Sequence, residues 1–272
     1  SRRAGAGVMG SLPLAQPEAS TPGHTMLAPG GLPKRRYSSR RTTVAGMCEH
    51  KFENSAVLDD SLASAVVARL EGGIAARGHA FLVVSGGSTP RGLFTRLAQS
   101  KLAWDKVTVL LADERWVPPD HEDCNERMVR EHLLVGNASE AQLLSLVSDY
   151  PDVATNLARV KELLASVGTF DVVILGMGLD GHTASLFPDA PELAEGLATS
   201  EDALMTYPGA APHARITLSY HRLRDTGFGV LHIVGQAKRL VLDDALGQCD
   251  SMIHPVLGFV SGENPFEVYY AR

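Results

Sequence analysis

Residues 176–185, Gly-Met-Gly-Leu-Asp-Gly-His-Thr-Ala-Ser, place ionisable side chains among glycines directly after the apolar run Val172–Leu175. Histidine readily gains and loses a proton near neutral pH, which suits a general acid or base. Asp180, two residues before His182, can orient the imidazole ring. The carboxyl ends of strands are the usual ligand site of an open α/β sheet. We therefore expect His182 and Asp180 to be catalytic, and a hydrogen-bonded structural histidine is the alternative.

Residues 85–90, Ser-Gly-Gly-Ser-Thr-Pro, form a second candidate loop between an expected strand and an expected helix. The backbone N–H groups and hydroxyls of Gly86, Gly87, Ser88 and Thr89 can surround an anion at the positive end of the helix dipole. The loop matches neither the dinucleotide-binding fingerprint nor the P-loop. We expect it to bind a phosphate group, and a tight structural turn is the alternative.

Charged residues near the ends of other apolar runs are candidates for catalysis and anion binding. Alternate side chains of an extended segment share a direction, so Asp113 and Arg115 are expected to point into the crevice, with Glu114 turned away. Arg215 and Lys238 are expected phosphate ligands, Arg215 as a bidentate fork and Lys238 as a point charge. A surface ion pair and solvated charges are the alternatives.

The sequence predicts neither a metal site nor a covalent nucleophile. Cys48, Cys124 and Cys249 fit neither a disulfide framework nor a metal-ligand spacing, and no cluster of Cys, His and carboxylate has the spacing of zinc ligands. Ser85 and Ser88 lack the Gly-x-Ser-x-Gly elbow of serine hydrolases. We expect water to be the nucleophile if the reaction is hydrolysis, with no cofactor, and we expect a reducing, cytoplasmic compartment.

The elements that position these groups alternate between apolar strands and amphipathic helices. Apolar residues at helical spacing predict a helix over residues 57–74 with a stop at Gly78. Continuous apolar strands between helices are typical of a mainly parallel α/β sheet that is covered on both faces. The other expected elements are strands at Ala80–Val84, Val107–Leu111, Val172–Leu175, 216–218, 228–234 and 266–270, and helices at 90–97, 125–134, 152–167 and 236–246.

The first 45 residues differ in composition from the rest of the chain. They are rich in Gly, Pro, Ser and Thr, and they carry seven Lys or Arg residues against one Glu. This composition predicts a disordered basic N-terminal extension over residues 1–45 and one catalytic domain over residues 46–272. A natural extension, expression-derived sequence and an organelle-targeting peptide are the open explanations for it.

The charge balance bears on the partners of the chain. The formal net charge is -6 over 272 residues, so the part after the basic segment is strongly acidic and repels nucleic acid and anionic membranes. No stretch approaches the roughly 20 apolar residues of a membrane span. We expect a small-molecule partner, and neither nucleic acid nor a membrane. The sequence makes no prediction of oligomeric state.

Taken in order, these segments resemble the 6-phosphogluconolactonase family over roughly residues 50–270. The most specific piece is the run Gly-Met-Gly-Leu-Asp-Gly-His-Thr-Ala-Ser-Leu-Phe-Pro at residues 176–188. The resemblance implies a modified doubly wound, Rossmann-like α/β fold that is shared with glucosamine-6-phosphate deaminases. The segments that carry the resemblance are residues 85–90, 113–118, Asn125, 176–188, Arg215–Leu218 and 235–238.

The position five residues after His182 separates the two activities of this family. Related deaminases have a Glu there that supports ring opening and proton shuttling, whereas this chain has Phe187. A phenyl ring cannot relay protons, so the resemblance favours the lactonases. A deaminase/isomerase and a non-catalytic sugar-phosphate sensor are the alternatives.

The resemblance implies that the substrate is a sugar phosphate, 6-phospho-D-glucono-1,5-lactone, which is hydrolysed to 6-phospho-D-gluconate in the oxidative pentose phosphate pathway. His182 would assist the attack of water on the lactone carbonyl, with Asp180 and Asp113 as the other catalytic residues. The expected ligands of the substrate and its phosphate are Gly86, Gly87, Ser88, Thr89, Arg115, Arg215 and Lys238.

Overall fold

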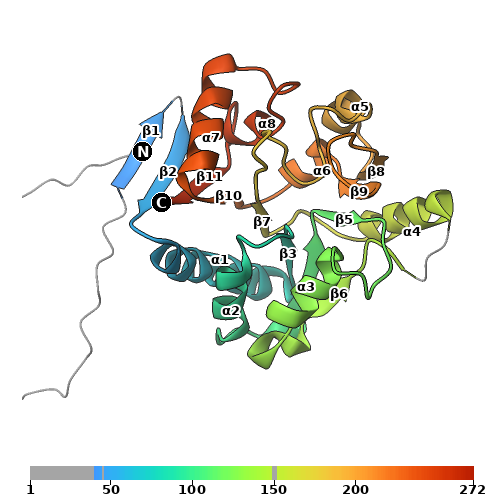
Figure 1. The fold of residues 1–272 in the computed structure, drawn as a ribbon. Coiled ribbons are helices and arrows are strands. Elements are labelled where there is room, and N and C mark those ends of the chain that lie inside the picture. The colour runs from blue at the N-terminus through green and yellow to red at the C-terminus, as the bar shows by residue number, and fades with distance from the viewer. Residues whose placement is uncertain (1–39, 45, 149–151) are drawn as a thin grey trace, which may run out of the picture. The chain divides into compact units, whose positions relative to one another are not determined.

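The computed structural model describes residues 40–44, 46–148 and 152–272, which belong to the compact unit Ser38–Arg272. Its centre is an eight-stranded sheet of order β1-β2-β11-β10-β7-β3-β4-β6 (Figure 1). All neighbouring strands are parallel except β1 and β2. The strands are β1 (Arg40–Val44), β2 (Met47–Phe52), β3 (Ala80–Val84), β4 (Val107–Leu111), β6 (Gln142–Leu144), β7 (Val172–Leu175), β10 (Gly229–Val234) and β11 (Glu267–Ala271).

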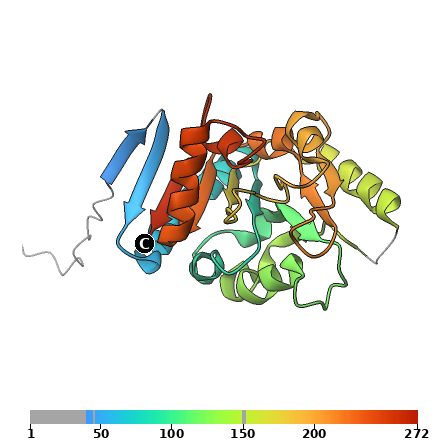
Figure 2. The same cartoon turned by 45° about the horizontal axis from the view of Figure 1, so that its top comes forward.

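Helices cover both faces of the sheet, as Figures 1 and 2 show. The chain crosses the sheet in one direction from β2 to β6 and in the other from β7 to β11. Right-handed crossovers therefore put the first three helices on one face and the later ones on the other. The helices are α1 (Ser55–Arg77), α2 (Arg91–Ala98), α3 (Asn125–His132), α4 (Val153–Ala165), α5 (Leu193–Ala198), α6 (Tyr220–Arg224), α7 (Gln236–Gln248) and α8 (Leu257–Val260), with short 3₁₀ turns η1 (Trp104–Lys106) and η2 (Gly136–Glu140).

Local sequence explains why the first long helix lies where it does. The Asn54 side chain caps the start of α1 by accepting a hydrogen bond from Val57 N, which satisfies one of the unpaired donors of the first turn. Gly78 ends the helix in the left-handed conformation at φ +77°, which glycine adopts without steric cost. The expected helix and its glycine stop are therefore confirmed.

The direction of the chain reverses between the neighbouring strands β3 and β7, where Val84 lies opposite Ile174. The connections that leave these two strands run to opposite faces of the sheet, which opens a crevice at their carboxyl ends. Residues 85–90 leave β3 and residues 176–185 leave β7. The two glycine-containing loops singled out by the sequence therefore meet at this crevice.

A second, antiparallel sheet of order β5-β9-β8 adds residues to the same region. Asp113–Arg115 follow the strand Val107–Leu111 as expected, but they form a strand of this second sheet, which the sequence analysis did not predict. The chain changes partner at Ala112, whose N–H bonds to Val84 O and whose carbonyl accepts from Leu218 N. The strands of this sheet are β5 (Asp113–Arg115), β8 (Ala203–Thr206) and β9 (Arg215–Leu218).

Strand β1 lies inside the segment that the sequence analysis treated as an N-terminal extension. Arg40–Val44 pair with β2 in an antiparallel ladder although their sequence shows no apolar periodicity, and the boundary at residue 45 stays a prediction. The rest of the expected extension, residues 1–39 and 45, lies outside the described residues.

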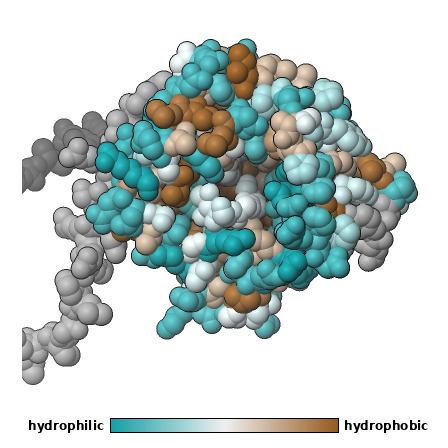
Figure 3. Space-filling model, viewed as in Figure 1, coloured by the Kyte–Doolittle hydropathy of each residue, from teal (hydrophilic) through white to brown (hydrophobic). Residues whose placement is uncertain are grey.

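The surface of the described residues carries scattered apolar groups rather than a long apolar segment. Figure 3 shows that hydrophilic residues dominate the face seen in Figure 1, with hydrophobic residues in small groups. None of the described helices combines the length and the apolar character that a membrane crossing requires.

Candidate active site

A cavity of about 240 Å³ lies at the crevice between β3 and β7. It is lined by the loops that follow these two strands, by residues of β5 and β9 of the small sheet, and by residues of β10 and α7. Every site residue expected from the sequence lines this cavity except Asp180, which lies behind His182. The tertiary structure thus brings together groups that are up to 152 positions apart, from Gly86 to Lys238.

The His182 ring is held through one nitrogen. Nδ1 lies 2.5 Å from Oδ1 of Asp180, and the His182 backbone N–H donates to the same carboxylate at 3.2 Å. Because an ionised carboxylate only accepts hydrogen bonds, Nδ1 carries the proton and Nε2 keeps its lone pair. Burial raises the pKa of the Asp180 carboxyl, but the hydrogen bond and charge of His182 outweigh burial, so the pKa is lowered overall. Asp180 therefore stays ionised and keeps the ring in this tautomer.

The plane of the His182 ring is fixed by Phe187. The two rings stack at a centroid distance of 3.9 Å and an interplanar angle of 24°. The guanidinium carbon of Arg215 lies 5.1 Å from the centroid of the Phe187 ring. Phe187 is buried, so it links the imidazole to one of the expected phosphate ligands.

Glycine is required where the loop 176–185 turns beneath the imidazole. A Cβ on Gly178 would lie 2.2 Å from Nδ1 of His182, so any larger residue would displace the ring. Gly181 has φ +81°, and a Cβ there would also approach His254 to 2.5 Å. Ala184 adopts φ +49°, which is uncommon for a residue with a side chain. Close contacts with His182 and His254 therefore restrict the loop 176–185 to this conformation.

The loop 85–90 has the features of an anion site. It leads into the N-terminus of α2, which is the positive end of that helix dipole, and Pro90 and Phe94 at this end also line the cavity. Gly87 has φ +90°, and a Cβ on Gly86 would lie 1.9 Å from Oδ1 of Asn125, so both glycines are needed for the shape of the loop. Lys238 Nζ donates to Oγ1 of Thr89 at 3.3 Å. Burial lowers the pKa of Lys238, so the binding of an anion beside it would stabilise its charge.

Two arginines lie side by side at the other wall of the cavity. The antiparallel register of β5 and β9 pairs Arg115 directly with Arg215. Burial lowers the pKa of Arg215, the charge of Asp113 opposes this effect, and the charge of Arg115 adds to it. Two neighbouring guanidinium groups repel each other unless an anion lies between or beside them, so this wall also favours an anionic ligand.

Asp113 is buried and connects this wall to the loop 176–185. Its Oδ2 accepts a hydrogen bond from Oγ of Ser185 at 2.5 Å and lies 3.8 Å from Nη1 of Arg215. Nδ2 of Asn125 donates to the Asp113 carbonyl at 3.0 Å. Asp113 therefore lines the cavity and also holds Ser185 and Arg215 in place through its carboxylate.

Glu114 points away from the cavity, as the sequence predicted. Its carboxylate accepts hydrogen bonds from the backbone N–H groups of Arg115, Asn125 and Glu126 and so caps the start of α3. Burial raises its pKa to about 7, against the lowering effect of those hydrogen bonds. Glu114 thereby fixes α3, and with it the Asn125 side chain that packs against Gly86.

His232 on β10 is a cavity residue that the sequence analysis missed. It is 2 % exposed, lines the cavity, and its Nε2 lies 3.5 Å from Oδ1 of Asp59. Burial, followed by the charge of Lys238, lowers its pKa to about 4, so the ring is neutral at physiological pH. A polar residue inside the otherwise apolar run 228–234 was the available signal.

Comparison with known proteins agrees with this geometry. The family model described as "Glucosamine-6-phosphate isomerases/6-phosphogluconolactonase" matches residues 53–265. The chain is 41 % identical over 226 residues to a 6-phosphogluconolactonase of Rhizobium meliloti, covering 82 % of this chain and 97 % of that protein. It is 36 % identical over 223 residues to a 6-phosphogluconolactonase of Pseudomonas putida, covering 81 % of this chain and 91 % of the relative.

Solved structures give the same result for the fold. A crystal structure of a 6-phosphogluconolactonase from Shewanella baltica superposes with a TM-score of 0.80 at 39 % identity, covering 82 % of this chain and 97 % of the other. A monomeric glucosamine-6-phosphate deaminase superposes with a TM-score of 0.67 at 17 % identity, covering 82 % of this chain and 97 % of the other, which shows a shared fold only. The Rossmann-like fold expected from the sequence is confirmed.

Proposed function

The chain belongs to the glucosamine-6-phosphate isomerase/6-phosphogluconolactonase family, and on this premise we propose that it hydrolyses 6-phospho-D-glucono-1,5-lactone with His182 as general base. The observation that carries the proposal is the 2.5 Å contact between Nδ1 of His182 and Asp180, at a cavity that is also lined by Arg115, Arg215 and Lys238. This contact leaves Nε2 available to a water molecule in the cavity.

The reaction begins with that water. Nε2 of His182 takes one proton while the water oxygen forms a bond to C1 of the lactone and the carbonyl electrons move to the carbonyl oxygen. The tetrahedral intermediate then collapses, the bond between C1 and the ring oxygen breaks, and the imidazolium returns its proton to that ring oxygen. A positioned base of this kind contributes about 10²–10⁴ in rate. The imidazole is regenerated, and the new carboxyl group releases its proton to water at neutral pH to give 6-phospho-D-gluconate.

The phosphate at the other end of the substrate sets the position of the carbonyl. Lys238, Thr89 and the N–H groups of the loop 85–90 are proposed to hold it, together with Arg215. A charge-assisted hydrogen bond is worth about 1.5–3 kcal/mol, so several of them supply the binding energy that keeps C1 beside His182. Arg115 extends the same positive wall, and Asp113 is proposed as a positioning residue that ties Ser185 to Arg215.

A lactone-hydrolysis assay coupled to the next dehydrogenase, with the spontaneous rate subtracted, tests the proposal. The wild-type chain should hydrolyse the lactone well above background, and His182→Ala should lose about 10²–10⁴ in kcat with its fold retained. His221→Ala, at an exposed histidine of α6, is the matched control and should keep full activity. Unchanged turnover in His182→Ala would refute its assignment as the base.

The same preparation tests the two alternatives. Release of ammonia from glucosamine 6-phosphate would support a deaminase, which the Phe187 stack on His182 disfavours because that position cannot relay a proton. Binding of the sugar phosphate without hydrolysis, together with retardation of DNA, would support a sensor. A cytoplasmic location, and partners that include neither nucleic acid nor a membrane, stay predictions from composition.

A further inference from the structure

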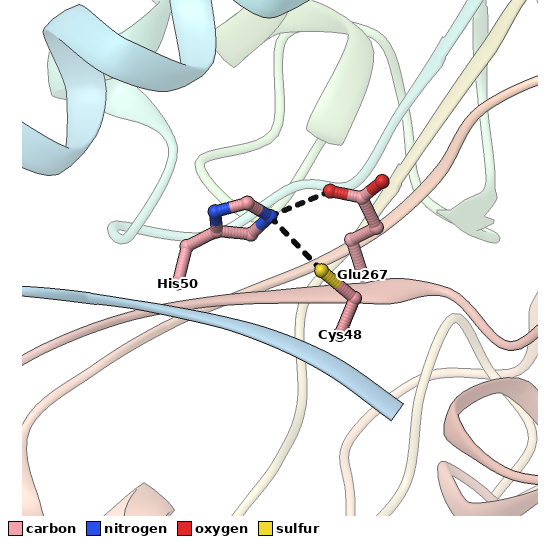
Figure 4. A group of neighbouring side chains, drawn as sticks. All are labelled: Cys48, His50 and Glu267. Atoms are coloured by element: carbon pink, nitrogen blue, oxygen red, sulfur yellow. Dashed lines mark hydrogen bonds and ion pairs between the residues drawn. The ribbon is translucent and has the colours of Figure 1, made fainter. Parts of the chain in front are cut away.

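A cluster of three potential metal ligands lies outside the cavity, on the neighbouring strands β2 and β11 of the main sheet. Figure 4 shows the side chains of Cys48, His50 and Glu267 pointing toward one another. Nε2 of His50 lies 2.6 Å from Oε2 of Glu267 and 3.5 Å from Sγ of Cys48. All three donor atoms lie within 4.8 Å of one another, and none of the three residues lines the cavity.

Strand pairing explains why these residues meet. Cys48 and His50 are alternate residues of β2 and so share one face of the sheet. The parallel register of β2 and β11 pairs Glu49 with Val268, which places Glu267 beside Cys48. His50 also stacks on Tyr269 at a centroid distance of 4.5 Å, which holds the imidazole in place. The donor atoms are thus carried by two hydrogen-bonded strands rather than by a mobile loop.

The arrangement differs from that of a Cys-His-Glu nucleophile. In such a relay the histidine contacts the nucleophile with one ring nitrogen and the orienting carboxylate with the other. Here both contacts are made by Nε2, and Figure 4 shows Nδ1 on the far side of the ring. The sulfur, nitrogen and oxygen atoms are therefore close enough together for a single cation to contact all three.

We propose that Cys48, His50 and Glu267 bind a thiophilic divalent transition-metal ion, with Zn²⁺ as the cation that suits the set. Bond lengths of about 2.0–2.3 Å at tetrahedral angles separate neighbouring ligand atoms by about 3.2–3.7 Å. The Sγ to Nε2 distance of 3.5 Å already fits this range, and Nε2 and Oε2 need to separate from 2.6 Å when the ion replaces their hydrogen bond. A thiolate and a carboxylate also neutralise the two charges of the ion.

The surroundings allow an ion to enter and suggest what it would do. The Glu267 side chain is 27 % exposed and Cys48 is partly exposed, so water can provide the fourth ligand from the open side. The ion would join β2 to β11, near the end of the chain, without touching the residues assigned to the lactone. Its effect is therefore on stability rather than on turnover.

Titration of the full-length chain with Co²⁺, after removal of any histidine tag, provides a direct test. A tetrahedral Co²⁺ bound to a thiolate gives visible d–d bands and a thiolate-to-metal charge-transfer band in the near ultraviolet. The wild-type chain should give both at one equivalent, and Zn²⁺ should displace them. Cys48→Ser should lose the charge-transfer band, whereas Cys249→Ser, at an exposed cysteine, should keep it.

Two features of the chain make the result decisive. Cys124 is buried, and burial raises the pKa of its thiol to about 11. The thiol also donates a hydrogen bond to Glu114, so Cys124 does not compete for the ion. The cluster His121, Asp123 and His213 contains no thiol, so Co²⁺ bound there gives no charge-transfer band. A charge-transfer band that survives in Cys48→Ser, d–d bands without charge transfer, or no binding at micromolar Co²⁺ would each overturn the proposal.

Glu267→Gln gives an independent check that does not depend on loss of the cysteine. The amide can still hydrogen-bond to His50, so the strands should pair normally, as circular dichroism can verify. Loss of the carboxylate ligand should weaken Zn²⁺ binding by at least about 10–100-fold, the range seen when groups that only support a ligand are removed. Zn²⁺ should raise the Tm of the wild-type chain and leave lactone turnover unchanged. An affinity equal to that of the wild type would count against the site.

Discussion

The ring of Phe187 stacks on the ring of His182 at a centroid distance of 3.9 Å, so residue 187 fixes the plane of the imidazole instead of exchanging protons with it. The same phenyl ring lies beneath the guanidinium of Arg215. One buried side chain thus joins the proposed base to the proposed phosphate site. The packing of Phe187 therefore sets the distance between the proposed base and the proposed phosphate ligand.

Phe187→Ala should therefore harm both catalysis and stability. Removal of a buried phenylalanine typically costs about 3–5 kcal/mol of unfolding free energy because a cavity is left. The imidazole would lose its stacking partner, so kcat should fall by about 10-fold or more while KM rises through Arg215. Chemical denaturation and steady-state kinetics measure the two effects. Phe187→Leu, which fills more of the space, should recover stability more than kcat, and equal recovery of both would argue against an orienting role.

Asp180→Asn should lower kcat without unfolding the chain. An asparagine can donate as well as accept, so it no longer enforces a proton on Nδ1, and the loss should be about 10²–10⁴ by analogy with other histidine-carboxylate pairs. Because His182 holds the pKa of Asp180 below its ordinary value, its protonation should not limit kcat/KM above about pH 4. A pH-rate profile checks this expectation. A fall in the kcat/KM of the wild type above about pH 4 that is absent from Asp180→Asn would contradict this expectation.

The two cations of the phosphate site should differ in what their removal costs. Lys238→Ala should raise KM by about 10–100-fold with little change in stability, because Lys238 contacts Thr89 by a single hydrogen bond. Arg215→Ala should raise KM as well, but it also leaves the buried Asp113 without its ionic partner and should cost about 3–5 kcal/mol of unfolding free energy. Parallel kinetics and urea titrations measure the difference. A pure loss of kcat at unaltered KM in either variant would refute its anchoring role.

His232 should make the chain less stable in mild acid. Its ring has a pKa of about 4 in the folded state, against the ordinary value of 6.5, so between these values the unfolded chain binds a proton that the folded chain does not. Stability therefore falls as the pH falls through this window. His232→Gln should gain up to about 3 kcal/mol relative to wild type between pH 7 and pH 4.

Urea unfolding of both proteins at several pH values measures that gain. Burial raises the pKa of Asp59 to about 6, which gives the opposite slope, and Asp59 lies 3.5 Å from His232, so the same comparison in an Asp59→Asn background separates the two groups. His221→Gln, at an exposed position, is the control and should follow the wild-type curve. A constant difference between His232→Gln and wild type across the pH range would show that the buried ring is not the cause.

The sequence by itself determined five of the parallel strands (β3, β4, β7, β10 and β11), the main helices and the two loops proposed to carry the chemistry, whereas the parallel strands β2 and β6 were not predicted. An apolar run such as Val172–Leu175 is stable only when it is buried, and Gly78 ends α1 because glycine adopts the left-handed conformation at little cost, so these features follow from local physics. His182, Asp180 and the loop 85–90 were identifiable because their residue types have few other uses after a buried strand. Pairing of Asp113–Arg115 with β9 was missed, since a three-residue polar strand has no apolar pattern of its own.

Only the tertiary structure decided which distant residues meet. The buried His232 faces the cavity because β10 lies beside β7, and its pKa is lowered by burial that no local pattern reveals. Cys48 and His50 show no metal spacing in the sequence, because their third partner, Glu267, is brought to them by the register of β2 and β11. Local sequence sets the conformation of a segment, whereas contacts across the sheet depend on strand order, which is fixed by the packing of the whole chain.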